Sequence, residues 1–373
     1  MAEENDDFSL SHANTFYVGG KYIQDARGTH MTGQMCVRRY GKRIHGQPAV
    51  IFIHGAAQTG THFEATPDMR PGLAILQAAD DWECYVVDQP GVGRSRYHAT
   101  DLGELTHYTV EELESTFTAP SHESSPKAHL HSQWPGSGKR GDVVFDAFYA
   151  SQVGHIGNYS KAEALFRDAI KPLLERVGPA FLVTHSQSGP LGWHAADECP
   201  DLVRGIIALE PNGPPYTPPN CPPFSTRPEI VGKLVRPYGI TSTPLHYDPP
   251  LSPETINLPY ESSIEGGEAG AKGIGAQRLH RPRQAHPARK LENLLQVPVL
   301  IVTAEASYHF EYDHLTVEFL RDAGVPTEHV YLADEGIRGN GHLMAIEKNN
   351  KEIQQLMNRW LRKRLGGRGS ISQ

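Results

Sequence analysis

A chain of 373 residues can form one large α/β domain with insertions, or two domains. Its mean hydropathy of −0.46 and hydrophobic fraction of 38% predict a soluble protein, and no apolar run approaches the roughly 20 residues of a membrane span. The net charge of −8 argues against a general nucleic-acid-binding protein.

The N-terminal segment is acidic and lacks the pattern of a secretory signal. Residues 1–14 are expected to be disordered, and residues 1–7 are acidic where a signal would be basic and then apolar. We therefore expect an intracellular, cytoplasmic protein. The four cysteines show no C-x-x-C spacing, and Cys84 is expected to be an inert buried thiol rather than part of a disulfide framework.

Short apolar runs recur along the rest of the chain and predict strands. The first two have the pattern of an antiparallel pair. Most of the later runs are apolar nearly throughout, which is typical of strands that are buried on both faces of a parallel sheet. The expected strands lie at residues 16–22, 33–40, 49–53, 84–88, 180–184, 205–209, 298–303 and 328–332.

Helical patterns separate these strands. Ser160 and Glu163 have the spacing of a capping box that opens one helix, and the C-terminal segment forms another. Alternating strands and helices predict an α/β fold with a mostly parallel central sheet flanked by helices. The apolar faces comprise Leu165, Phe166, Ala169, Ile170, Leu173 and Leu174 in the first helix and Ile353, Leu356, Met357, Trp360 and Leu361 in the last.

Two long segments interrupt the alternation. Residues 95–150 are rich in His and Ser, and residues 211–290 are crowded with Pro and Gly. Both leave from the C-terminal ends of strands, where open α/β sheets place their active sites, so we interpret them as a cap or lid. The resulting core comprises residues 1–94, 151–213 and 291–373, and the cap comprises residues 95–150 and 214–290.

The segment Thr-His-Ser-Gln-Ser at 184–188 follows a buried strand and precedes a helix. It is a relaxed form of the G-x-S-x-G nucleophile elbow, where small flanking residues let the strand and helix backbones approach. Ser186 has two small flanks, whereas Ser188 would have Pro190, which lacks an N–H, as a flank. We therefore expect Ser186 to be the nucleophile beneath the cap. A serine-rich turn without chemistry is the alternative.

A serine hydroxyl needs a base, and the base needs an orienting acid. His342 lies in a glycine-rich loop that lets its imidazole reach back over the sheet, although a capping or surface histidine is the alternative. Glu210 directly follows a buried strand, where a carboxylate needs a partner such as an imidazolium. Glu305 and Asp313 are the rival acids. A capping or salt-bridging residue is the alternative for Glu210, and we expect Glu305 to be a solvated carboxylate.

The oxyanion hole requires two backbone N–H donors beside the serine. Gln187, directly after the serine, supplies one, and Ala56 in the loop after residues 49–53 supplies the other. Gly55 permits the tight turn of that loop, for which an ordinary glycine-rich turn is the alternative. His54 is expected to be structural.

Other motifs carry weaker signals. His309, Asp313 and His314 suggest a metal site, but H-E-x-x-H is absent and a solvated face is the simpler interpretation, so we expect neither a metal nor an organic cofactor. Gly91-Val-Gly93 lacks the third glycine of a dinucleotide-binding fingerprint. Several aromatic residues could line an acyl pocket or simply pack the cap: Phe145, Phe148, Tyr149, Tyr216, Tyr238 and Tyr247.

Four motifs in order resemble the α/β-hydrolase superfamily: His54-Gly55, Asp88-x-Pro-Gly-x-Gly-x-Ser95, the serine elbow and Gly341-His342. Most members have the triad acid after strand seven, where this chain has Ser307. Thr-His-Ser-Gln-Ser-Gly followed by Ala-Leu-Glu-Pro is similar to a small group of atypical microbial esterases with the triad glutamate after strand six. The resemblance implies a triad of Ser186, Glu210 and His342.

One departure from that group is in the oxyanion loop, where the group has cysteines after His-Gly and this chain has Ala56 and Ala57. Backbone N–H donation survives this change. The group is described as secreted, which the acidic N-terminus does not support.

Together these residues predict a serine hydrolase that cleaves a carboxylic ester or lactone through an acyl-enzyme intermediate. One alternative is a C–C bond hydrolase or lyase-like enzyme that acts on a β-diketone or polyketide. The other is a non-catalytic ligand receptor on a hydrolase scaffold. The expected partner is a small-molecule substrate. The sequence leaves the oligomeric state open, and a homodimer formed through the cap is one possibility.

Overall fold

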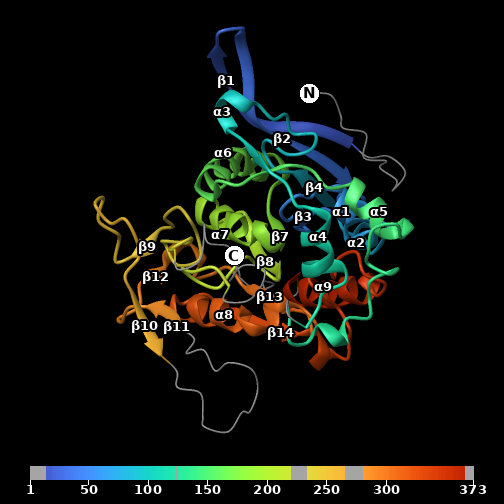
Figure 1. The fold of residues 1–373 in the computed structure, drawn as a ribbon. Helices are drawn as coiled ribbons and strands as arrows, with labels where there is room; N and C mark the ends of the chain where they lie inside the picture. The colour runs from blue at the N-terminus through green and yellow to red at the C-terminus, as the bar shows by residue number, and fades with distance from the viewer. Residues whose placement is uncertain (1–13, 123–124, 220–232, 265–279, 366–373) are drawn as a thin grey trace.

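An eight-stranded sheet forms the centre of the protein in the computed structural model, which describes residues 14–122, 125–219, 233–264 and 280–365 (Figure 1). Residues 1–14 are expected to be disordered, but of these only Asn14 belongs to the described residues. The strand order is β1-β2-β4-β3-β7-β8-β13-β14. β2 pairs antiparallel with β1 and β4, and the remaining pairs are parallel. The strands are β1 (Asn14–Asp25), β2 (Gly28–Tyr40), β3 (Ala49–Ile53), β4 (Cys84–Asp88), β7 (Ala180–His185), β8 (Val203–Leu209), β13 (Val299–Thr303) and β14 (Thr327–Tyr331).

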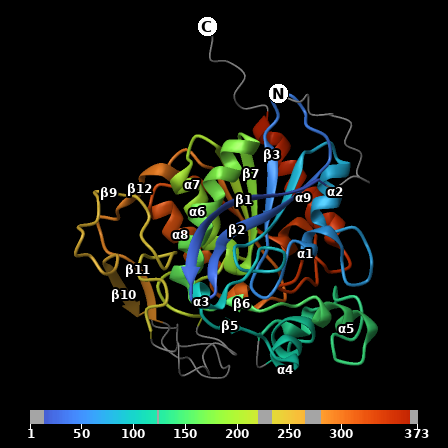
Figure 2. The ribbon, with the colours of Figure 1, turned by 90° about the horizontal axis from the view of Figure 1, so that it is seen from above.

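Helices cover both faces of this sheet because alternate strand residues point to opposite sides. Ile51 and Ile53 contribute to a core with one set of helices, and Val50 and Phe52 contribute to a core with the other. Figure 2 shows the two helical layers on either side of the strands. The predicted α/β-hydrolase fold is confirmed. The first layer contains α6 (Tyr159–Val177), α7 (Gly189–Glu198) and α8 (Asp313–Asp322), and the second contains α2 (Leu73–Ala79) and α9 (Asn350–Leu365).

The predicted capping box at the start of α6 is wrong. Asn158 caps this helix instead, because its side chain accepts a hydrogen bond from the Lys161 N–H at 3.0 Å. The buried Glu163 carboxylate does not bond to the N-terminus of α6. It accepts hydrogen bonds from the N–H groups of Ser242 and Thr243 instead. Glu163 therefore fastens the second insertion to the core. It does not cap the helix, because the N–H groups of Ser242 and Thr243 offer its carboxylate buried donors.

In both ribbon views, α4 and α5 of the first insertion lie on the opposite side of the molecule from β9, β10 and β11 of the second (Figures 1 and 2). The first brings α4 and α5 over the C-terminal ends of the strands. The second contributes Tyr216, Leu245 and Tyr247 to the same core as α7 and α8, so its described part packs as an extension of the core. The remaining α-helices and strands are α1 (Thr61–Glu64), α3 (Ala99–Leu102), β5 (Leu105–Thr106), α4 (Val110–Leu113), α5 (Val143–Ala150), β6 (His155–Ile156), β9 (Tyr247–Asp248), β10 (Tyr260–Ile264), β11 (His280–Gln284) and β12 (Lys290–Leu291).

Two further expectations concern cysteines and membrane spans. Cys36, Cys84 and Cys199 are buried and free, as expected for Cys84, while Cys221 lies outside the described residues. Among the described helices, none combines the length and the apolar character needed to cross a bilayer.

Candidate active site

The elbow after β7 holds Ser186 in a strained conformation. Its φ is +54°, in the left-handed region that residues other than glycine rarely occupy. Close backbone packing surrounds the turn. A Cβ atom on Gly189 would lie 2.5 Å from Cβ of Pro211, and one on Gly55 would lie 3.1 Å from Cβ of Ser186. These approaches explain why glycine occupies positions 189 and 55 beside the elbow.

The second serine of the motif has a structural role. The Ser188 hydroxyl accepts a hydrogen bond from the His185 N–H at 2.8 Å and donates to the carbonyl oxygen of Ile53 at 2.7 Å. It is fully buried and ties the elbow to the end of β3. Ser186, in contrast, lines a cavity that His342 also lines.

Glu210 follows β8, the sixth strand of the sheet along the chain, and is fully buried. Its Oε2 lies 2.6 Å from Nδ1 of His342 and accepts a hydrogen bond from the Ser307 hydroxyl at 2.7 Å. Its Oε1 accepts a hydrogen bond from the Ala304 N–H at 2.8 Å. The Ala304 N–H and the Ser307 hydroxyl therefore hold the carboxylate against the imidazole. Ser307, which stands where most relatives are expected to have the acid, supports Glu210.

The rival acids have other partners. Glu305 forms an ion pair with Arg338 at 3.0 Å and accepts a hydrogen bond from the Gly339 N–H. It is therefore a salt-bridging residue, which differs from the solvated carboxylate that we expect from the sequence. Asp313 is fully buried and lies 2.8 Å from Nδ1 of His309, so it orients a different imidazole.

Burial shifts the pKa values of the carboxylate and the imidazole in opposite directions. It raises the pKa of Glu210 to about 8, although the donors from Ala304 and Ser307 oppose the shift. It lowers the pKa of His342 well below 6.5, and the neighbouring rings of His309 and His185 add to this shift. The imidazolium is thus disfavoured at rest, which leaves a ring nitrogen available as a base.

Four buried imidazole rings lie in a row through the site, with the two outer pairs stacked and the middle pair tilted by 36°. The ring centroids are 5.4 Å apart between His62 and His185, 4.8 Å between His185 and His342, and 4.6 Å between His342 and His309. Nε2 of His185 also donates to the carbonyl oxygen of His342 at 2.9 Å. The residue before the nucleophile therefore holds the loop that carries His342. No motif or spacing in the sequence indicates this row.

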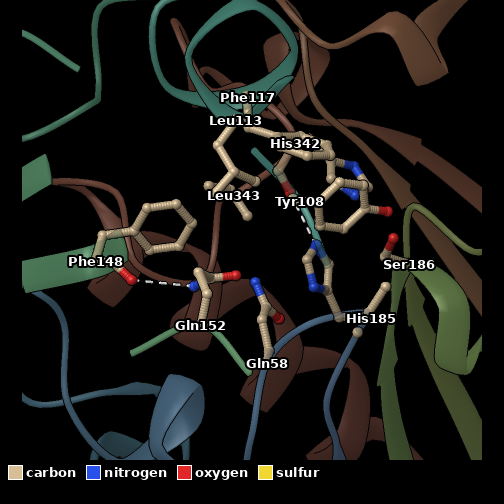
Figure 3. Close-up of a pocket in the computed structure, with 12 residues that line it drawn as sticks. Gln58, Tyr108, Leu113, Phe117, Phe148, Gln152, His185, Ser186, His342 and Leu343 are labelled. Atoms are coloured by element: carbon tan, nitrogen blue, oxygen red, sulfur yellow. Dashed lines mark hydrogen bonds between the residues drawn. The ribbon is translucent and has the colours of Figure 1, made fainter. Parts of the chain in front are cut away.

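The cavity beside Ser186 is roofed by the first insertion. Figure 3 shows Leu113 and Phe117 above His342, with Gln58 and His185 on the opposite side. The cavity volume is about 20 Å³, enough for a single water molecule. No described residue of 214–290 lines it, and of the aromatic residues expected at an acyl pocket only Phe148 does. The lining residues are Gly55, Ala56, Gln58, Tyr108, Leu113, Phe117, Phe148, Gln152, His185, Ser186, His342 and Leu343.

The expected oxyanion donors lie on the two loops beside the nucleophile. Ala56 lines the cavity, and Gln187 directly follows Ser186 at the start of the turn before α7. The buried Asp88 carboxylate accepts hydrogen bonds from the N–H groups of Gly60 and Arg94. It thereby holds the loop that carries Ala56.

A buried carboxylate that sequence reasoning missed supports the His342 loop. Glu347 accepts hydrogen bonds from the Gly341 N–H at 3.0 Å and from Nδ2 of Asn340 at 2.8 Å. Its Oε1 also lies 2.7 Å from Nε2 of His131, which belongs to the first insertion. Glu347 therefore connects the cap to the loop. Its position ahead of α9 resembles that of an ordinary exposed acid, so the sequence offers no signal for this role.

The metal site considered from the sequence combines different residues in the structure. Among the described residues around the cavity, donor atoms of Glu210, His309 and His342 come within 4.8 Å of one another. His314 is not part of this group. The group could hold a metal ion only at the expense of the hydrogen bond between Glu210 and His342.

Comparisons with known proteins bear on the family and the fold of this chain. Residues 50–353 match the model of the Alpha/beta hydrolase family. The chain is 39% identical over 349 residues to a protein from Fungal sp. (strain ATCC 74256) named probable secreted lipase phiG, covering 93% of this chain and 89% of that protein. It is also similar to the solved structure of a bacterial esterase, with 20% identity, a TM-score of 0.56 and coverage of 96% of this chain and 98% of that one. This last similarity concerns the fold alone.

The expected cytoplasmic location is wrong. It depended only on the acidity of residues 1–7, and the relative with 39% identity is named as secreted. A few acidic residues do not determine the compartment of a protein, because targeting depends on a longer pattern of basic and apolar residues.

Proposed function

The chain belongs to the alpha/beta hydrolase family, and from this premise we propose that it is a serine esterase that cleaves carboxylic esters or lactones through an acyl-enzyme intermediate. One observation carries the proposal: a serine at φ +54° shares a cavity with an imidazole whose Nδ1 lies 2.6 Å from a buried carboxylate. This combination is typical of a nucleophile, a base and an orienting acid. The finer assignment, to esterases with the glutamate after strand six, is part of the proposal.

In the proposed reaction, the Ser186 hydroxyl attacks the carbonyl carbon of the ester while Nε2 of His342 takes its proton. The Glu210 carboxylate holds the proton on Nδ1 and stabilises the imidazolium that forms. The backbone N–H groups of Ala56 and Gln187 donate to the developing oxyanion, each worth about 3 kcal/mol by analogy with measured donors.

The tetrahedral intermediate then collapses. His342 returns the proton to the leaving alkoxide, and the acyl group stays on the Ser186 oxygen. A water molecule, deprotonated by His342, attacks the acyl carbon and releases the carboxylic acid and the free serine. The lowered pKa of His342 supports a neutral base at rest.

The substrate needs more room than the cavity provides. A volume of about 20 Å³ admits water but no ester, so the roof must move when a substrate binds. The roof side chains Leu113, Phe117 and Phe148 are apolar, which favours an apolar acyl or alcohol group beneath them. We extend the proposal to an enzyme that acts outside the cell, because the fungal relative is named a secreted lipase.

The direct test is turnover of p-nitrophenyl butyrate by Ser186→Ala. We expect its rate to fall to the background level with an unchanged circular dichroism spectrum. Ser115→Ala is the matched control, because Ser115 is an exposed cap serine. Undiminished turnover by Ser186→Ala would refute the proposal. Cleavage of a β-diketone without ester turnover would instead favour the C–C hydrolase.

A further inference from the structure

Three potential metal ligands, remote in sequence from Ser186, come together at the turn of the β1–β2 hairpin. Asp25 ends β1, His30 lies in β2, and His98 directly precedes α3 at the start of the first insertion. Both ribbon views place α3 beside the tip of this hairpin (Figures 1 and 2). One donor atom from each residue lies within 4.8 Å of the other two.

The distances between these donor atoms approach those of a tetrahedral site. Nε2 of His30 lies 3.1 Å from Oδ1 of Asp25, and Nε2 of His98 lies 3.7 Å from Oδ2 of the same carboxylate. Ligands that bind Zn²⁺ at about 2.0–2.1 Å in a tetrahedron are about 3.3 Å apart. The three side chains therefore need only small rotations to share one ion.

His98 is the residue that points to a ligand. Its side chain is only 4% exposed, yet in the described part of the chain neither of its ring nitrogens has a hydrogen-bond partner. The distance of 3.7 Å to Asp25 is too long for a hydrogen bond. A buried imidazole without partners is costly, and a metal ion bound at Nε2 would remove part of that cost.

The surrounding charges allow a cation. The Arg27 N–H donates to Oδ1 of Asp25 at 2.8 Å, and this contact lowers the pKa of Asp25 and favours the ionised carboxylate. The Arg27 guanidinium lies 3.9 Å from Oδ2, but its side chain is 77% exposed and can turn into solvent. Asp25 therefore supplies the single negative charge of the site, and the two imidazoles bind as neutral ligands.

We propose that Asp25, His30 and His98 bind one divalent transition-metal ion, with Zn²⁺ as the best match and a water molecule as the fourth ligand. Two imidazoles and one carboxylate form a donor set that suits Zn²⁺ rather than Mg²⁺ or Ca²⁺. The ion fastens the hairpin to the start of the first insertion. It acts beside an existing link, in which the Thr32 hydroxyl of β2 donates to the Asp101 carboxylate of α3 at 2.9 Å.

The test is a calorimetric titration of the full chain, purified without a histidine tag and stripped with a chelator, with ZnCl₂ alone. We expect one Zn²⁺ per chain, a higher melting temperature with Zn²⁺, and no binding of Mg²⁺. His98→Ala and His30→Ala should each weaken Zn²⁺ binding by at least about 100-fold, since the loss of even a supporting partner can cost that much. His45→Ala, at an exposed histidine outside the cluster, should bind as the wild type does.

Two results would overturn the inference. One is stoichiometric Zn²⁺ binding that persists in His30→Ala. This variant is expected to fold normally, because His30 is less buried than His98. The other is Zn²⁺ binding that is lost in His309→Asn and kept in His98→Ala, because it would place the ion beside Glu210 and His342. Ester turnover is not needed for this test, so its outcome is independent of the proposed function.

Discussion

Replacement of Glu210 by glutamine changes the proposed acid without changing its shape. In the wild type the carboxylate receives hydrogen bonds from Ala304 and Ser307 and lies 2.6 Å from Nδ1 of His342. An amide nitrogen at the same place would donate to Nδ1 and leave the ring proton on Nε2. The imidazole could then no longer accept the proton of the Ser186 hydroxyl.

The size of the effect follows from the geometry. The carboxylate stabilises the imidazolium that forms during attack, and two unit charges about 4 Å apart at an effective dielectric constant of about 20 interact by about 4 kcal/mol. This corresponds to about 10³-fold in rate. The wrong tautomer adds to the loss, so Glu210→Gln should lower kcat by about 10³–10⁴-fold. The corresponding Asp→Asn change in the serine-protease triad lowers kcat by about 10⁴-fold.

The assay is kcat for p-nitrophenyl butyrate at pH 9, with circular dichroism to verify folding. Glu305→Gln is the matched control, because Glu305 pairs with Arg338 and should retain kcat within about threefold. A Glu210→Gln enzyme within tenfold of the wild type would refute the reasoning. A large loss in Glu305→Gln alone would move the acid to the loop after β13.

The same pair predicts the pH profile of the wild type. The active form has an ionised Glu210 and a proton on Nδ1 of His342, so uptake of one further proton by the pair abolishes the base. Burial favours this uptake and raises the pKa of Glu210 to about 8. Thus kcat/KM should be highest above pH 8 and should fall as the pH drops through that value. An apparent pKa below 6 would contradict this assignment.

Three further changes have distinct expected outcomes. Ser307→Ala removes a hydrogen bond to the Glu210 carboxylate that is worth about 1.5–3 kcal/mol. The apparent pKa of kcat/KM should therefore rise by about one or more. An unchanged pH profile would exclude the hydrogen bond between Ser307 and Glu210. Gly189→Ala should lower the free energy of unfolding by about 1–3 kcal/mol in urea titrations, because the new methyl group would meet Pro211; an unchanged midpoint would argue against the close approach. Phe117→Ala should raise the ratio of kcat/KM for p-nitrophenyl octanoate over acetate by about tenfold if the roof limits the acyl group, whereas a constant ratio would argue that it does not.

The sheet could be predicted from the sequence because its central strands are buried on both faces. Val50 to Ile53 alternate between two cores, so each position is apolar and the run is visible as one strand. The elbow and Glu210 could be proposed for a related reason. Parallel strands end at one edge of the sheet, so polar residues directly after β7 and β8 come together there.

The remaining features depend on partners that are distant in the chain. The spacing of Ser160 and Glu163 predicts a capping box, but the donors to Glu163, which are Ser242 and Thr243, lie 79 and 80 residues away. The contacts of Glu347 with His131, and of His98 with Asp25, also join separate segments. No periodicity or local motif encodes such pairs, since only the folded chain brings them into contact.

The proposed function requires Ser186 to be an activated nucleophile. Its most direct test is the reaction of the wild-type chain with a fluorophosphonate, followed by mass spectrometry of the modified peptide. We expect one adduct per chain, located on Ser186, and labelling at least 100-fold slower in His342→Ala. Label on another serine, or no label on a chain that still turns over esters, would contradict it.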